Sequence, residues 1–173
     1  MVQMIVHLIT VYVDLPMSMA MSLIGLGDWE RLPVEKTGPA TDHTTLRFGF
    51  FMYIETSNPR QDGDRAILQS KLFLPSGDSG ERCLQFYYHM YGEHIGELKV
   101  LYSESDDIDK ELWRETKNMG NQWHLKGVQL PPGSSPYRVK FVGIRGSGYQ
   151  GDVAIDDVFF TDGKCPPNAN ITP

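Results

Sequence analysis

The chain has 173 residues and a formal net charge of −6, from 16 Lys and Arg against 22 Asp and Glu. This length is enough for one domain with a sizeable core. The acidic balance, without a basic stripe, excludes nucleic acid and anionic membranes as expected partners, because nothing is arranged to meet phosphates.

Residues 1–26 differ in composition from the rest of the chain. The run from 1 to 13 is apolar with few interruptions, and no Lys or Arg precedes Arg31, so the positively charged start of a secretion signal is missing. His7 within this run and Asp14 directly after it also make the segment a poor membrane span. Three interpretations stay open: an imperfect secretion signal, an additional strand over residues 5–13, or a sequence foreign to the domain.

From Gly27 onward, short strand-like segments alternate with polar turns. Alternating patterns, or patterns rich in β-branched and aromatic residues, predict strands over residues 47–56, 65–74, 82–91, 97–103, 111–116, 122–130, 137–145 and 152–161. Seventeen Gly and eleven Pro supply turns between them. No segment has a convincing helical period, so eight or nine strands favour an all-β fold of two packed antiparallel sheets.

The predicted strand 152–161 is the most informative. It is apolar on both faces, so we expect it in the interior of a sheet. Strict alternation puts its apolar side chains in two sets, with Val153, Ile155 and Phe159 on one face and Ala154, Val158 and Phe160 on the other. The adjacent carboxylates of Asp156 and Asp157 interrupt this strand, and they need a ligand, hydrogen bonds or a solvated strand end.

Three strings that look catalytic or metal-binding have simpler interpretations. Gly77-Asp78-Ser79-Gly80 resembles the nucleophile loop of trypsin-like proteases, but such an enzyme needs a double barrel well beyond this length. Gly146-Ser147-Gly148-Tyr149-Gln150-Gly151 fits G-x-G-x-x-G, but a strand follows it instead of a helix, which favours a tight hairpin. The carboxylates of 106–111 lack the glycine of an EF-hand loop and indicate a solvated loop. We therefore expect no catalytic residue.

Cysteine and histidine patterns do not indicate a zinc site. Cys83 and Cys165 are the whole supply of cysteine and have no ligand partners close by. A disulfide that closes a loop of about 80 residues and a pair of separate buried thiols both stay open. His89 and His94 are five residues apart, which places them on opposite faces of a strand.

A hard-cation site is the remaining candidate. Asp42 and either Asp156 or Asp157 could converge on Ca²⁺ or Na⁺ if their segments are neighbours, since such ions take oxygen ligands. The other interpretation is that these aspartates cap turns or accept hydrogen bonds from backbone N–H groups, and the residues alone leave both open.

Many strings, taken together, resemble the MAM domain, the extracellular module named for meprin, neuropilin and receptor-type tyrosine phosphatase mu. They occur in order between Leu26 and Cys165: Gly27-Asp28-Trp29, Thr37-Gly38-Pro39, Asp42-His43-Thr44-Thr45, 49–57, Cys83-Leu84-Gln85-Phe86, Tyr91-Gly92, 96–100, Leu112-Trp113, Gln122-Trp123, Arg145-Gly146 and 151–158. The resemblance divides the chain into an atypical segment 1–26, a MAM-like domain 27–165 and a tail 166–173.

The resemblance implies a jelly-roll sandwich of two antiparallel sheets, secreted or on a cell surface. It implies a non-catalytic interaction or adhesion module of a larger protein that needs no cofactor, with membrane contact only through that parent. The expected partner is a protein on a cell surface or in the matrix, and homophilic and heterophilic binding both stay open. The resemblance also implies a disulfide between Cys83 and Cys165, and it favours a structural Ca²⁺ or Na⁺ held by Asp42 with Asp156 or Asp157.

The chain departs from the family at its start and leaves an alternative function. Family members open with a strand that carries two cysteines and an acidic residue, whereas residues 17–26 contain neither. The alternative is a carbohydrate-binding β-sandwich with a structural calcium ion, whose sugar platform would use Tyr87, Tyr91, Trp113 and Trp123. Asn170-Ile171-Thr172 is a sequon for N-glycosylation of Asn170.

Overall fold

The computed structural model describes residues 9–12, 37–44, 51–54, 56–75, 81–104 and 108–167. These residues form the strands β1 (Ile9–Tyr12), β2 (Met52–Ile54), β3 (Arg65–Ser70), β4 (Arg82–Tyr91), β5 (Glu97–Glu104), β6 (Lys110–Glu115), β7 (His124–Leu130), β8 (Tyr137–Ile144) and β9 (Asp152–Asp162). Within these ranges there is no helix of the length and apolarity that a membrane crossing requires. Residues 17–26, 76–80, 105–107 and Asn170 lie outside the described residues.

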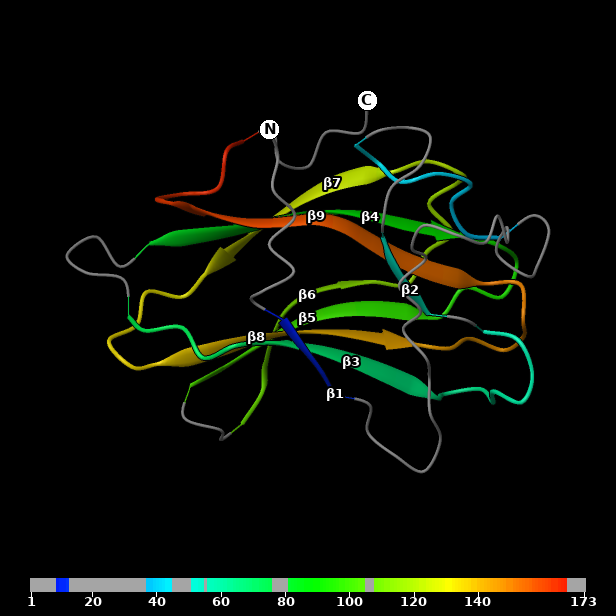
Figure 1. The fold of residues 1–173 in the computed structure, drawn as a ribbon, viewed down its shortest axis with the longest axis horizontal. Helices are drawn as coiled ribbons and strands as arrows, with labels where there is room; N and C mark the ends of the chain where they lie inside the picture. Colours follow the sequence, from blue (N-terminus) through cyan, green and yellow to red (C-terminus); the bar gives the residue numbers. More distant parts are fainter. Residues whose placement is uncertain are drawn as a thin grey trace.

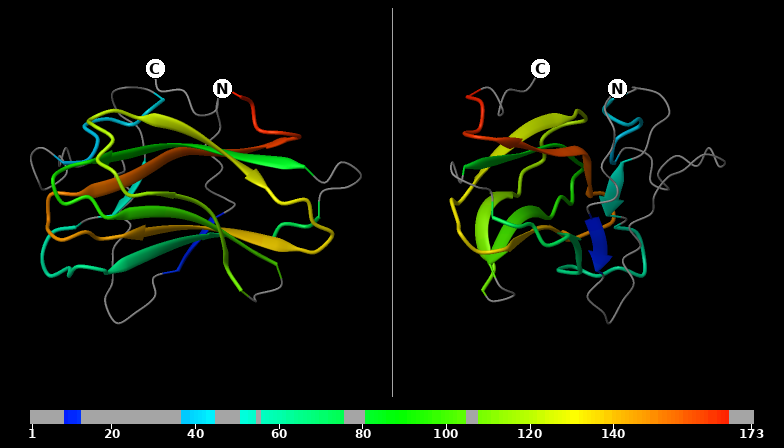
Figure 2. Two further views of the ribbon diagram at one scale, coloured as in Figure 1. Left: turned by 180° about the vertical axis from the view of Figure 1, so that it is seen from behind. Right: turned by 60° about the vertical axis from the view of Figure 1, so that its left-hand side comes forward.

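The strands form two antiparallel sheets that pack face to face (Figures 1 and 2). One sheet has the order β1-β3-β8-β5-β6 and the other has the order β2-β9-β4-β7. Among the described strands, only β5 and β6 follow each other in the same sheet, and every other pair of consecutive strands lies in different sheets. This repeated crossing is the jelly-roll connectivity, so the predicted all-β sandwich is confirmed.

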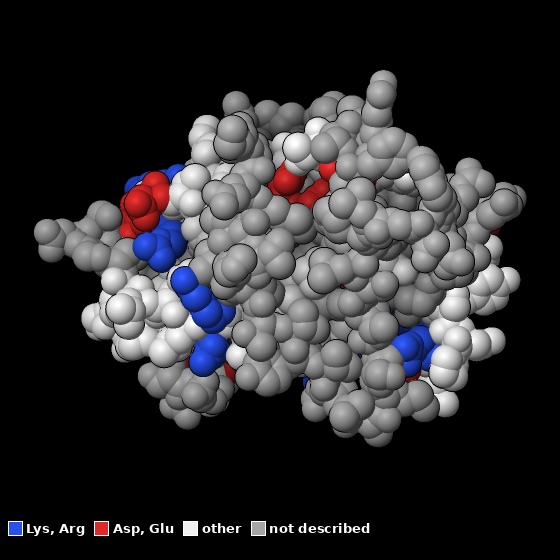
Figure 3. All heavy atoms as spheres, in the orientation of Figure 1, with Lys and Arg blue, Asp and Glu red and all other residues white. Residues whose placement is uncertain are grey.

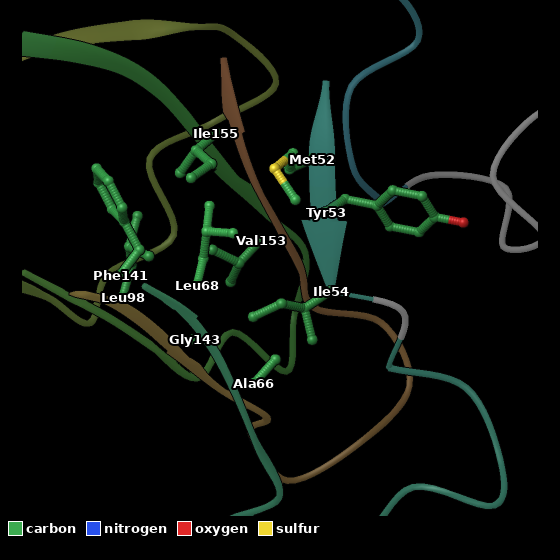
Figure 4. A pocket seen from close by; sticks show the side chains of 10 residues that line it. All are labelled: Met52, Tyr53, Ile54, Ala66, Leu68, Leu98, Phe141, Gly143, Val153 and Ile155. Atoms are coloured by element: carbon green, nitrogen blue, oxygen red, sulfur yellow. The ribbon is translucent and has the colours of Figure 1, made fainter. Parts of the chain in front are cut away.

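The core lies between the sheets, where every second side chain of each strand points inward. Phe86 of β4 is fully buried at its centre, with ring centroids 4.9 Å from Phe141 and 5.6 Å from Trp113. A small apolar cavity remains beside β2, as Figure 4 shows. Gly143 faces Ile54 there, and a Cβ on Gly143 would lie 1.6 Å from Ile54 Cδ1. The missing side chain therefore makes room for Ile54.

Strand β9 lies between β2 and β4, which confirms its predicted interior position. Strict alternation along it is wrong, however, because its register against β4 shifts between Gln85 and Tyr87. Asp157, with a φ of 46°, is part of this bulge. One extra residue exchanges the two faces of a strand. Val158 and Phe160, rather than Phe159, therefore continue the core face.

The glycine-rich connection 145–151 joins strands of different sheets, so the expected tight hairpin is wrong. Its glycines let the connection lie against the 92–96 loop. A Cβ on Gly146 or Gly151 would lie 2.2 or 2.3 Å from the carbonyl oxygen of His94. His94 N also donates a hydrogen bond of 2.8 Å to Gln150 O. The motif therefore serves loop packing in this fold.

Strand β1 pairs antiparallel with β3, with Thr10 opposite Gln69. It lies within the 5–13 run for which an additional strand is one of the three interpretations. Its position at the end of the sheet order places it beside β3 at one edge of the five-stranded sheet.

Candidate functional site

A disulfide joins Cys83, near the start of β4, to Cys165, just beyond β9. The S–S distance is 1.97 Å and the Cα atoms are 4.9 Å apart, so the alternative of two separate thiols is wrong. Gln129 of β7 adds to this junction, because its Oε1 accepts a 2.8 Å hydrogen bond from Cys165 N and its Nε2 donates to Arg82 O. The end of the domain is thus tied to two strands.

The outer face of the four-stranded sheet carries the aspartates of β9, and the 37–44 segment lies against them. Asp152 is fully buried at the start of β9. Its Oδ2 accepts a 2.7 Å hydrogen bond from the Thr37 hydroxyl, and its Oδ1 accepts one of 2.9 Å from the Thr56 hydroxyl. Residues 115 positions apart therefore meet at the start of this segment.

The predicted cation residues also lie in this region. Asp156 Oδ2 accepts a 2.9 Å hydrogen bond from His43 N, and Asp156 Oδ1 accepts one of 2.8 Å from Asp157 N. Asp157 Oδ2 contacts His43 Nδ1 at 2.8 Å and accepts the hydroxyl of Thr44. Asp42 is 3% exposed, and Asp156 is 4% exposed. The structure thus places the three predicted residues in one region.

Burial shapes the charge of Asp156. Loss of contact with water raises its pKa to about 6, because a low-dielectric site disfavours the carboxylate. The N–H groups of His43 and Asp157 lower this pKa, and the charges of Asp157 and Asp42 raise it. The carboxyl is therefore held between hydrogen-bond donors and two further acids.

Among the described residues, the side chains of Asp42, Asp156 and Asp157 do not form a complete set of metal ligands. In the part of the chain that the structure describes, no three His, Cys, Asp or Glu side chains are grouped so that they could hold a metal ion. Ca²⁺ takes six to eight oxygen ligands. Here both oxygens of Asp156 and one oxygen of Asp157 already accept hydrogen bonds from N–H or O–H groups.

Aromatic side chains fill the space between the 37–44 segment and the sheet. The His43 ring stacks on Tyr87 at a centroid distance of 3.3 Å, and Trp123 Nε1 donates to Thr41 O at 3.1 Å. Phe51, Tyr53 and Ala154 form a second buried cluster with Trp123. Beneath this segment, the outer face of the sheet is therefore covered.

The four aromatic residues of the carbohydrate alternative do not share one face. Trp113 packs against the core, with its ring centroid 5.2 Å from Tyr88 and 5.6 Å from Phe86. Tyr87 and Trp123 contact His43 and Thr41 of the 37–44 segment on the outer face. Trp113 therefore cannot share a sugar platform with Tyr87 and Trp123, while Tyr91 lies beside His89, with ring centroids 6.4 Å apart.

His89, whose burial no sequence motif marks, lies on the outer face of β4. It is 1% exposed, its Nε2 lies 3.0 Å from Asn121 Oδ1, and its buried Nδ1 has no hydrogen-bond partner among the described residues. Burial lowers the pKa of His89 to about 4, because the imidazolium ion would lose its hydration. The hydrogen bond with Asn121 opposes this shift, and the nearby His124 adds to it.

Replacing His89 by glutamine should change how the stability of the domain depends on pH. The pKa of His89 is about 4 when folded against a usual 6.5, so its contribution to stability is complete above pH 6.5 and is lost as the pH falls toward 4. The free energy of unfolding should therefore change differently in the two proteins. The difference between wild type and His89→Gln should fall by about 3 kcal/mol between pH 6.5 and pH 4. Urea denaturation at a series of pH values measures it.

The raised pKa of Asp156 changes stability with pH in the opposite direction to the lowered pKa of His89. Its contribution to stability is complete below its usual pKa of 3.8 and is lost as the pH rises through about 6. Both proteins contain Asp156, so this contribution cancels in the difference between them. Parallel pH curves for wild type and His89→Gln would show that His89 does not titrate with folding.

Comparison with known proteins identifies the family. The sequence matches the family model described as MAM domain, meprin/A5/mu, over residues 19–166. The chain belongs to the MAM family. The family of the sequence resemblance is thereby confirmed, and this MAM domain is an extracellular module.

Relatives of this MAM domain are longer proteins. MAM domain-containing glycosylphosphatidylinositol anchor protein 1 of Rattus norvegicus is 46% identical over 132 residues, which are 75% of this chain and 14% of the relative. Thyroid hormone-induced protein B of Xenopus laevis is 36% identical over 145 residues, 80% of this chain and 20% of the relative. The chain therefore spans a small part of the length of the curated relatives it matches.

A solved structure shares the fold. The K3 cleaved adhesin domain of Lys-gingipain from Porphyromonas gingivalis W83 has a TM-score of 0.51 at 18% identity, with 65% of this chain and 74% of that chain covered. At this identity the likeness extends to the β-sandwich alone.

Proposed function

We propose that this MAM domain is a non-catalytic interaction and adhesion module of a larger cell-surface protein. We further propose that it contacts a protein partner through the loop end of the sandwich that carries Tyr149. The names of the relatives describe glycosylphosphatidylinositol anchor proteins, which supports a parent protein held at the membrane. One observation carries the choice of surface: an exposed aromatic ring stands on a firmly held loop.

Tyr149 is 51% exposed in the connection between β8 and β9. Among the described residues, the other exposed large apolar side chains are aliphatic: Leu72, Leu74 and Ile108. Tyrosine is enriched in the centres of protein interfaces, because it offers a large contact area for the loss of few rotamers. An exposed tyrosine is thus a suitable anchor for a partner.

The backbone around Tyr149 is held from two sides. The Thr56 hydroxyl oxygen, which also contacts Asp152, lies 2.9 Å from Tyr149 O, and His94 N donates a 2.8 Å hydrogen bond to Gln150 O. A Cβ on Gly148 would lie 2.5 Å from His94 Nδ1, so the two loops are in close contact. Binding through a loop that is already ordered loses little conformational entropy.

The charges near this end are mixed. The neighbouring loops carry Arg60, Asp62 and Glu93. On the side of the molecule that Figure 3 shows, the Lys and Arg groups of the described residues are separate groups, some of them beside acidic ones. Such a surface favours recognition by shape and apolar contact over recognition of a polyanion.

Loss of the Tyr149 ring should weaken binding. The whole chain, made multivalent on beads, is tested against a panel of recombinant cell-surface and matrix ectodomains that includes this chain itself. For any ectodomain that binds, Tyr149→Ser should raise Kd by about 10-fold or more, as expected for an interface anchor. Surface plasmon resonance with purified proteins measures the change.

Leu74→Ser is the matched control. Leu74 is 73% exposed and follows β3, at the end of the sandwich opposite Tyr149, so the same loss of apolar surface should leave Kd unchanged. Absence of binding to every ectodomain would contradict an interaction role. Binding that Tyr149→Ser leaves intact would contradict the proposed surface.

A further inference from the structure

We propose that the aspartates of β9 hold the 37–44 segment on the sheet as hydrogen-bond acceptors, and that they do so without a bound cation. This disagrees with the cation that the sequence resemblance favours. It concerns how the domain is built and is independent of the proposed role of Tyr149.

The bulge of β9 orients the carboxylate of Asp157. Asp157 adopts a φ of 46°, a left-handed conformation that aspartate tolerates better than most residues. In this conformation its carboxylate meets two donors of the 37–44 segment, the ring of His43 and the hydroxyl of Thr44. The bulge that reverses the faces of β9 therefore also orients a carboxylate toward the 37–44 segment.

Asp156 holds the 37–44 segment through backbone hydrogen bonds. Each of its oxygens accepts one backbone N–H, from His43 at 2.9 Å and from Asp157 at 2.8 Å. Asp156 is 4% exposed, so these bonds replace the water that the carboxyl loses on burial. These two N–H groups take about half of the four lone-pair sites of the ionised carboxylate, one on each oxygen.

The 37–44 segment is held at both ends and in the middle. Thr37 binds Asp152 at the start, and His43 binds Asp156 and Asp157 near the end. Between them, the carbonyl oxygen of Thr41 accepts a hydrogen bond from Trp123 Nε1. Donors of this chain thus contact both oxygens of Asp156 and Oδ2 of Asp157, two of the three carboxylates that the cation interpretation uses.

The consequence is a covered sheet face. With the 37–44 segment in place, Tyr87 is stacked under His43, and Trp123 packs at the edge of the cluster with Phe51. This part of the four-stranded sheet is then unavailable to a partner, and the loop ends remain for binding.

Thermal unfolding of the whole chain tests the proposal. Melting temperatures are compared in EDTA and in CaCl₂ at about 5 mM, which exceeds the dissociation constants of weak extracellular calcium sites. The same comparison is made between NaCl and an equal concentration of choline chloride. We expect the wild type to melt at the same temperature in each pair of solutions, within about 1 °C, because no ion binds the folded state preferentially.

Variants test the hydrogen bonds. Asp157→Asn should lower the melting temperature by roughly 2–4 °C, since it weakens a charge-assisted hydrogen bond in a partly buried site. His43→Ala should lower it at least as much, because it also removes the stacking on Tyr87, and the double variant should melt near His43→Ala because both changes remove the contact between His43 and Asp157. Asp109→Asn is the control and should lower the melting temperature less, because the Asp109 side chain is 34% exposed against 15% for Asp157 and its partner Lys140 lies on the other sheet.

Hydrogen exchange of the wild-type chain tests the same hydrogen bonds without a substitution. In EDTA the amide of His43 should be protected, because it donates to Asp156. A rise in melting temperature with Ca²⁺ or Na⁺ that Asp42→Asn or Asp157→Asn abolishes would overturn the proposal. Loss of protection at His43 in EDTA, restored by Ca²⁺, would overturn it as well. Neither outcome bears on Tyr149.

Discussion

Replacing Cys83 by alanine together with Cys165 by serine should lower the free energy of unfolding by about 4–5 kcal/mol. The disulfide joins residues that are 82 positions apart, so its loss frees a long loop in the unfolded chain. Alanine is chosen at position 83 because Cys83 is fully buried, and a hydroxyl there would add the cost of an unpaired polar group.

Guanidinium denaturation with and without reductant measures this effect. Reductant should destabilise the wild type by a similar amount and leave the double variant unchanged. The hydrogen bonds of Gln129 to Cys165 N and Arg82 O remain in the variant, so they set how much order the end of the domain keeps. A double variant as stable as the oxidised wild type would contradict the structural role of the disulfide.

Phe86→Ala should cost about 3–5 kcal/mol, the usual range for removal of a fully buried phenylalanine. The Phe86 ring contacts Tyr88, Trp113 and Phe141 between the sheets, and three neighbours cannot all collapse into the space it leaves. Urea denaturation monitored by tryptophan fluorescence and circular dichroism measures the loss.

Phe159→Ala is the matched control for Phe86→Ala. Phe159 lies opposite Gln85 in the neighbouring strand, on the outer side of the sheet, and is only partly buried. The same chemical change there should cost clearly less. Equal costs at the two positions would mean that Phe159 belongs to the core and that β9 has no bulge at Asp157.

The strand pattern was readable in the sequence because a buried strand leaves a local signal. Alternation in 82–91 predicts one apolar face, and Leu84, Phe86, Tyr88 and Met90 are all buried in the core. The apolar run of β9 likewise predicts an interior strand, and β9 lies between β2 and β4.

Contacts between distant segments left no comparable signal. The bulge at Asp157 arises from the register between β4 and β9, so strict alternation assigned Phe159 to the wrong face. The glycines at 146 and 151 suggested a hairpin, whereas the space they provide is filled by the His94 carbonyl. Both errors come from a partner strand or loop that lies far away in the chain.

The aspartates show the same limit at the candidate site. An acidic pair in a buried strand must be satisfied, and the sequence predicts that much. Which groups satisfy it depends on where the 37–44 segment lies, more than a hundred residues earlier in the chain. A cation and a set of N–H and O–H donors are equally compatible with the residues until that position is known.

By itself, the sequence determined the class of the fold, the interior position of its last strand and, through its ordered motifs, the family. These follow from side-chain periodicity and from residue order, which are local properties of the chain. Only the tertiary structure decided which face each side chain of β9 occupies after Asp156, and which donors meet its carboxylates. The physical reason is that strand register and hydrogen-bond partners are pairwise properties, and a pair exists only once two distant segments lie side by side.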